Sequence, residues 1–123
     1  MSMMRRLRKL TLNAFIEKTL EKVEKPVAFL KYEGKEKEYL TYTHHGKPGL
    51  FADDSNEAEV YEVSVSVYSD KNYISLVEDV ISIMKEVGFI WTDSGEDMHD
   101  DETGLYYKVL YFEIERCDFI WQQ

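Results

Sequence analysis

Residues 59–88 (EVYEVSVSVYSDKNYISLVEDVISIMKEVG) place a strand pattern directly before a helix pattern. Apolar and polar residues alternate from Tyr61 to Val67, which is the period of two of a strand with one buried face. Apolar residues then recur at three- and four-residue steps from Tyr73 to Val87 and share one helical stripe. Both elements must bury an apolar side. We therefore expect them to pack together as the nucleus of the core.

The ends of this helix carry their own signals. Ser69 and Asp70 are good N-cap residue types, and Asp70 can accept a hydrogen bond from the first free amides of a helix. Gly88 stands where a left-handed C-cap is expected. The stretch predicts structure and contains no catalytic motif.

The same patterns predict the remaining elements. These are a helix over residues 4–23, ended by Pro26, and strands over residues 27–32, 38–45, 89–92 and 105–115. The first two strands are expected to pair as a hairpin. The order α-β-β-β-α-β-β predicts an α+β fold, with an antiparallel sheet of four to five strands and both helices packed on one face. The central helix is expected in a split β-α-β arrangement.

The last strand is apolar on both faces. Leu110, Phe112 and Ile114 fall on one face, and Tyr107, Val109 and Tyr111 on the other. Such a strand is either central in its sheet or covered on its outer face by another chain.

Length and charge restrict the classes of function. The 123 residues predict a single domain, with a basic arm over residues 1–10 and an aromatic tail over residues 117–123. The net charge is −9, and the arm contributes +4, which leaves −13 on residues 11–123. An acidic body repels phosphate backbones, so we expect no direct nucleic-acid binding. The arm is expected to be solvated; the alternative is contact with an acidic surface, such as a neighbouring copy.

Two features of the sequence concern the location of the protein in the cell. No apolar run approaches the roughly 18 residues of a membrane span, and the N-terminus lacks the apolar segment of a secretory signal, so we expect no membrane association. Cys117 is the single cysteine, which fits a reducing cytoplasm.

Candidate catalytic and metal-binding residues are few. His44 and His45 are neighbours on a predicted strand and therefore point to opposite faces, so they are not expected to share a metal ion. The acidic stretch over residues 93–104, which contains His99, does not have EF-hand spacing. Cys117 has no histidine near it in the sequence, and no phosphate-binding or nucleophile-elbow motif occurs. We expect a non-enzyme with no cofactor and no bound metal.

Exposed apolar side chains are the better candidates for function. Leu50 and Phe51 interrupt a loop of turn-forming residues, where they either fold back onto the body, the favoured reading, or touch a partner. Phe119, Ile120 and Trp121 at a chain end expose apolar surface unless they dock. The candidate subunit or partner contacts are Leu50, Phe51, Tyr107, Tyr111, Phe119 and Trp121.

The order of these features resembles a family. The pieces are VAFLKY, a loop with GLFADDSNEAE, the strand YEVSVSVYS, the helix DKNYISLVEDVISIMKEVGF, an acidic loop and the strand LYYKVLYFEIE, together covering about residues 26–116. This is similar to the small tail-completion or tail-terminator-like proteins of siphophages and prophages of Gram-positive bacteria. The resemblance implies a non-catalytic virion subunit that forms rings, commonly hexamers, assembles in the bacterial cytoplasm, and contacts the tail tube and the head–tail connector.

Two other classes of function remain open. The −13 on residues 11–123 suits an acidic binding module, such as a DNA mimic that inhibits a nucleic-acid enzyme, although the carboxylates cluster in two loops. A metal-dependent enzyme using His44, His99 and the acidic loops is the weaker alternative. Competition by DNA for a captured partner would favour the mimic, and metal binding by calorimetry would favour the enzyme.

Overall fold

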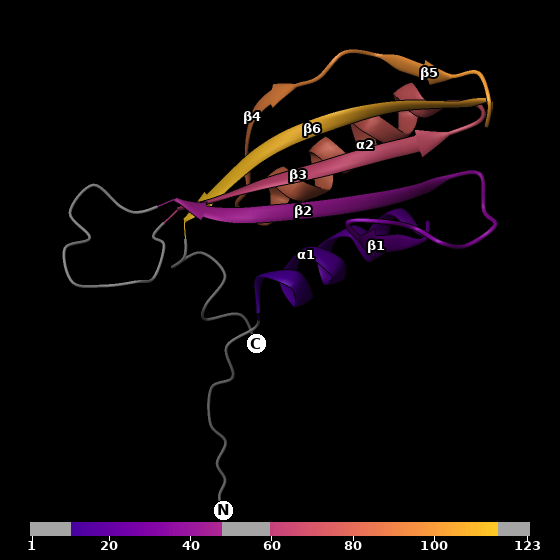
Figure 1. Cartoon of the computed structure of the whole chain (residues 1–123). Coiled ribbons are helices and arrows are strands. Elements are labelled where there is room, and N and C mark those ends of the chain that lie inside the picture. Colours follow the sequence, from indigo (N-terminus) through magenta and orange to yellow (C-terminus); the bar gives the residue numbers. More distant parts are fainter. Residues whose placement is uncertain (1–10, 48–59, 116–123) are drawn as a thin grey trace, which may run out of the picture.

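A computed structural model describes residues 11–47 and 60–115 of the chain (Figure 1). Its elements are the helix α1 (Leu12–Leu20) continued by the 3-10 turn η1 (Glu21–Val23), the strands β1 (Val27–Phe29), β2 (Tyr39–Lys47) and β3 (Val60–Ser69), the helix α2 (Tyr73–Glu86), and the strands β4 (Ile90–Ser94), β5 (Met98–Asp100) and β6 (Leu105–Glu115). The predicted central strand and helix and the predicted last strand are thereby confirmed.

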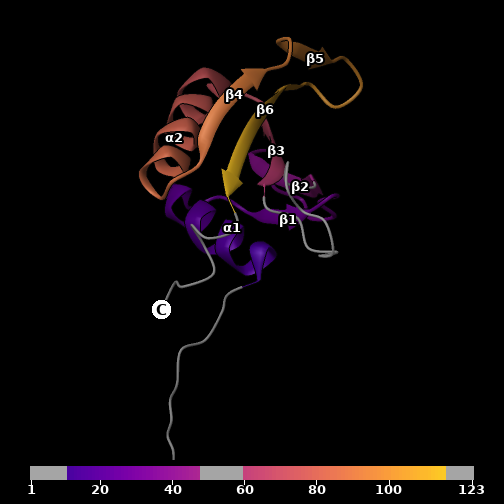
Figure 2. The same cartoon turned by 90° about the vertical axis from the view of Figure 1, so that its left-hand side faces the viewer.

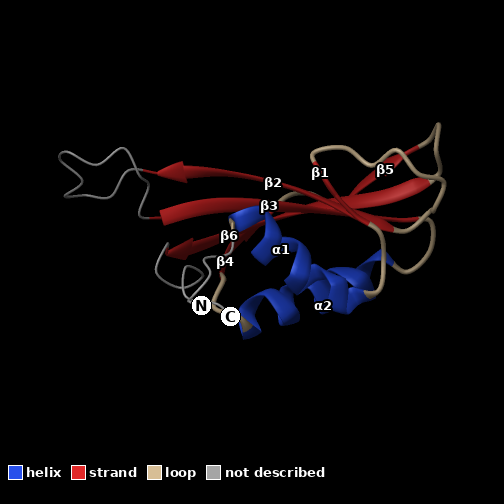
Figure 3. Cartoon of the chain, turned by 90° about the horizontal axis from the view of Figure 1, so that it is seen from below, coloured by secondary structure: helices blue, strands red, loops and turns tan. Residues whose placement is uncertain are grey.

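The strands form one six-stranded sheet in the order β1-β2-β3-β6-β4, with β5 also paired to β6. All pairings are antiparallel except that of β1 with β2. Both helices lie on one face of this sheet, which we call the helix side; the opposite face is called the outer face (Figure 3). The predicted α+β class and helix arrangement are confirmed, and the sheet has one strand more than the upper number predicted.

The predicted hairpin between the first two strands is wrong, because β1 runs parallel to β2 with Val27 opposite Leu40. Leu30, at φ +69°, turns the chain out of β1 immediately after Phe29. The segment that follows returns the chain to the level where β1 began, so that Leu40 donates its amide hydrogen bond to the Pro26 carbonyl at 2.8 Å. The chain therefore leaves β1 at Leu30 and enters β2 beside the start of β1, instead of reversing in the tight turn that a hairpin needs.

The crossover through α2 produces the predicted split β-α-β arrangement. Strands β3 and β4 are both antiparallel to β6, which lies between them, so β3 and β4 point in the same direction. The last strand, β6, lies inside the sheet between β3 and β4, which is the first of the two positions that its two-sided apolar pattern predicts.

The core lies between the helix side of the sheet and the two helices. Val63, Val65 and Val67 on β3 are at most 1% exposed, as their alternation predicts. Helix α2 buries the predicted stripe through Leu76, Val77, Val80 and Met84, and α1 adds Phe15, Ile16 and Leu20. Phe89 closes one end of this core, with its ring 5.6 Å from that of Phe15.

The caps differ from the prediction at one end of α2. Asn72, and not Asp70, is the N-cap, because its side-chain oxygen accepts the hydrogen bond of the Ser75 amide at 3.1 Å. Ser69 instead ends β3. Gly88 has φ +108° after the C-terminus of α2, as the left-handed C-cap prediction requires.

Candidate functional site

The edge of the sheet formed by β1 carries exposed apolar side chains. Phe29 is 47% exposed and Leu30 is 66% exposed. The Phe29 ring contacts the edge of Tyr42 at 5.4 Å and lies 6.0 Å from His44. Tyr42 and His44 both bond side chains of α1, so Phe29 lies on the helix side. We call Phe29 and Leu30 the β1 patch.

The other end of the sheet, at β4, carries a second apolar surface. Ile90 is 62% exposed, Trp91 is 44% exposed, and Ile74 on the neighbouring α2 is 58% exposed. Trp91 lines two hollows between α2 and β4, of about 230 Å³ and 550 Å³, and therefore lies on the helix side. Its indole donates to the Asp93 carbonyl at 2.9 Å and is 3.0 Å from Ser94 Oγ, which fixes the ring. Ile90 pairs with Glu113, whereas Trp91 pairs with the buried Phe112, so these two side chains are on opposite faces of β4. We call Ile74 and Trp91, together with Ile90 on the same edge strand, the β4 patch.

The strands that carry these two patches are the two ends of the strand order, and Figure 2 shows β4 beside α2 and β1 beside α1. Sequence reasoning missed the β1 and β4 patches. The apolar character of FIWT was visible, but only the strand order reveals that this segment is an outer strand with one unpaired edge among the described residues.

The outer face carries a row of tyrosines that sequence reasoning also missed. The rings of Tyr32, Tyr39, Tyr68 and Tyr107 stack in succession, with centroids 4.3, 4.6 and 5.5 Å apart. The last three are aligned by the register of β2, β3 and β6. Burial, followed by the neighbouring Tyr68 and Tyr32, raises the pKa of Tyr39, so the Tyr39 hydroxyl stays neutral at physiological pH.

The candidate contact residues from the sequence divide into two groups. Tyr107 is half-buried within the tyrosine row, and Tyr111 is 40% exposed on the same outer face. The structure thus brings these two together on one surface. Leu50, Phe51, Phe119 and Trp121 lie outside the described residues, as do the basic arm and the acidic loop residues Asp53, Asp54, Glu57 and Glu59. Their role as contacts stays a prediction.

The neighbouring histidines point to opposite faces, as predicted. His44 Nε2 bonds Asn13 Oδ1 of α1 on the helix side. Burial and the nearby His45 lower the pKa of His44. His45 lies on the outer face, 2.7 Å from Glu62 Oε1, beside a hollow of about 430 Å³ that Ser64, Asp93 and Tyr111 also line. The His45 side chain is 69% exposed, so water surrounds this contact with Glu62.

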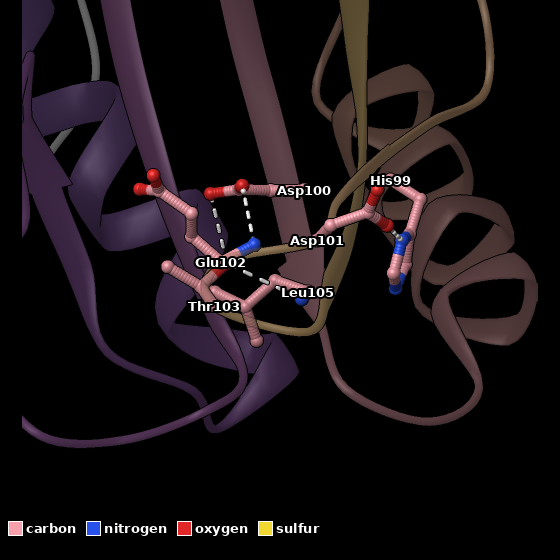
Figure 4. Close-up of polar contacts among 6 residues, drawn as sticks. All are labelled: His99, Asp100, Asp101, Glu102, Thr103 and Leu105. Atoms are coloured by element: carbon pink, nitrogen blue, oxygen red, sulfur yellow. Dashed lines mark hydrogen bonds and ion pairs between the residues drawn. The ribbon is translucent and has the colours of Figure 1, made fainter.

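The acidic stretch forms the β5–β6 hairpin, where a loop without a strand was predicted (Figure 4). Asp100 accepts from the Glu102 amide and the Thr103 hydroxyl, both at 3.0 Å, and His99 Nδ1 lies 3.0 Å from Asp101 Oδ1. The Asp100 carboxylate thus holds the turn. Across residues 11–47 and 60–115, no group of three or more His, Cys, Asp or Glu side chains is arranged to hold a metal ion.

A polar network joins β3 to the start of β2. The buried Ser69 hydroxyl donates to Glu38 Oε2 at 2.6 Å, and Lys25 Nζ bonds Glu38 Oε1 at 2.9 Å. The bonds from Lys25 and Ser69 lower the pKa of Glu38, and Glu38 in turn raises the pKa of Lys25. Glu38 thus accepts from both Lys25 and the buried Ser69 hydroxyl, and the network stabilises the connection between these segments.

A scan of the chain against protein-family models finds no match, and a search of curated proteins finds none either. In the part of the chain that the structure describes, no helix is both long enough and apolar enough to span a membrane.

Proposed function

We propose that this chain is a non-catalytic subunit of a phage tail, which assembles head to tail into a ring that caps the tail tube or joins the tail to the head. The observation that carries this proposal is the pair of exposed apolar patches at opposite ends of one sheet. The β1 patch and the β4 patch differ in residues and lie on different strands. A ring needs two such different surfaces, because each subunit uses one of them toward each neighbour.

The size of the exposed side chains supports an interface. Large apolar residues exposed together on a soluble domain indicate contact surfaces, and aromatic residues are enriched where proteins meet. The order of elements agrees with the expectation from the tail-terminator resemblance, and the acidic charge of residues 11–123 suits a ring through which DNA passes without adhering.

The test is absolute mass by light scattering after size exclusion, over a range of protein concentrations, together with co-purification with the tail-tube protein of the same genome. We expect a discrete oligomer, a hexamer above all, either alone or on the tube. Retention of DNA by the assembled protein at physiological salt would contradict the proposed DNA-conducting role.

The outcome that contradicts the ring is a chain that stays monomeric alone and also fails to bind the tube protein. Capture of a nucleic-acid enzyme that DNA displaces would favour an acidic inhibitor instead.

A further inference from the structure

We infer that one copy of this chain joins the next by antiparallel pairing of β4 with the neighbour's β1, so that one sheet continues from subunit to subunit. This inference rests on the proposed ring and names its subunit interface. Strands β1 and β4 are the two ends of the strand order, and no other described strand pairs with their outer edges. Such edges present unpaired backbone groups that a second chain can use.

The strand directions favour this pairing. Strand β1 is parallel to β2, β3 is antiparallel to β2, β6 is antiparallel to β3, and β4 is antiparallel to β6. It follows that β1 and β4 of one copy point in opposite directions. A second copy placed beside the first in the same orientation therefore brings its β1 antiparallel to β4, which is the more favourable ladder, and keeps all helices on one side.

The side chains agree with this direction. Cross-strand partners of an antiparallel pair lie on the same face of the sheet. Phe29 and Trp91 both lie on the helix side of their edges, and they are 47% and 44% exposed. If Trp91 is opposite the neighbour's Phe29, these two rings cover one another on the helix side. Ile90 then lies next to the neighbour's Leu30, the exposed turn residue that follows β1.

A two-fold dimer through β4 and β4 is the rival arrangement. It would also be antiparallel, but it would leave Phe29 and Leu30 of both copies uncovered, and it would close at two subunits. The head-to-tail arrangement covers both edges of every copy except at an open end. It is therefore the arrangement that buries the most apolar surface of these edges.

Disulfide trapping distinguishes the two arrangements. In a Cys117→Ser background, Ala28→Cys and Thr92→Cys are made as separate variants, which keep Phe29 and Trp91 in place. In the register above, these two positions are opposite each other across the interface, within the Cα separation that a disulfide tolerates. We expect mild oxidation of the mixed variants to give a covalent heterodimer, each variant alone to stay uncrosslinked, and the double variant to give a ladder of multimers.

Three results would contradict the inferred interface, and they differ in what they imply for the proposed ring. Crosslinking of Thr92→Cys alone would overturn the inference in favour of the two-fold dimer. A parent chain that is oligomeric by light scattering, with no crosslink between the mixed variants, would overturn the inference while sparing the proposed ring. A parent chain that is monomeric both alone and with the tube protein would overturn both.

Discussion

The hydroxyl of Tyr42 on β2 donates a hydrogen bond to Glu17 Oε2 on α1 at 2.5 Å, across 25 positions of sequence. Tyr42 is 1% exposed, and burial, with the bond to Glu17 second, raises the pKa of this phenol. Beside it, His44 bonds Asn13 of the same helix. Two polar side-chain bonds thus attach α1 to β2.

Removing the Tyr42 hydroxyl should weaken this attachment without disturbing the packing. Tyr42→Phe keeps the ring, and Glu17 is exposed and can be solvated, so we expect the free energy of unfolding to fall by about 1 kcal/mol. Urea unfolding followed by circular dichroism measures this loss. Tyr111→Phe on the outer face is the matched control and should change nothing measurable. An unchanged midpoint in Tyr42→Phe would mean that the bond does not contribute.

His44 should make the protein less stable in mild acid. Its pKa in the folded state is lowered from 6.5, mainly by burial, so the unfolded chain binds a proton more readily than the folded one. Stability is therefore complete above about pH 6.5 and falls as pH drops from there toward the folded pKa.

The measurement is urea unfolding at several pH values on either side of that point, for the parent and for His44→Gln. The variant does not titrate there and should lose less stability in acid. His99→Gln, on the exposed hairpin, is the control and should behave like the parent. Equal losses in the parent and His44→Gln would contradict the assignment.

Local patterns were sufficient for the elements that carry the core. The alternation in β3 and the stripe in α2 each lie within one short segment, and burial of one face explains both. The two-sided apolar pattern of β6 left two alternatives, and the strand order shows the first of them, a strand inside the sheet. These features depend on periodicity, which a single sequence displays.

The errors all involve information that periodicity lacks. The parallel pairing of β1 depends on the left-handed turn at Leu30, which a sequence reader expects at glycine or asparagine. The tyrosine row and the two edge patches depend on register and strand order, which bring together residues far apart in the chain. The shift of the helix cap from Asp70 to Asn72 is a choice between chemically similar residues two positions apart.

Ser69 should be the most sensitive polar residue of the β2–β3 connection. Its buried hydroxyl donates to Glu38 and accepts from the Lys71 amide at 3.0 Å, and Ser69→Ala leaves both groups without that partner. We expect a loss of about 1–3 kcal/mol in the free energy of unfolding. Ser82→Ala on the exposed side of α2 is the control, and urea unfolding compares the two.

The same variant has a pH signature. The pKa of Glu38 is lowered by its bonds to Lys25 and Ser69, so its contribution to stability is present above the ordinary value of 4.5 and is lost as pH falls through the lower folded pKa. Without the Ser69 bond, less of that contribution remains to be lost. Ser69→Ala should therefore lose less stability than the parent between pH 5 and pH 3, and a steeper loss would contradict the network.

A positive charge on the edge strand should separate assembly from folding. Trp91→Lys removes the largest side chain of the β4 patch and places on the edge the residue type that natural sheets use against edge pairing. Because Trp91 is 44% exposed, we expect a folded chain that fails to form the oligomer. Light scattering gives the mass, and circular dichroism verifies the fold. Tyr111→Lys, at 40% exposure, tests the candidate contact that the sequence predicts on the outer face; if the sheet edges form the interface, this variant assembles like the parent. Loss of assembly in Tyr111→Lys but not in Trp91→Lys would move the subunit interface from the sheet edges to the outer face, where Tyr107 also lies.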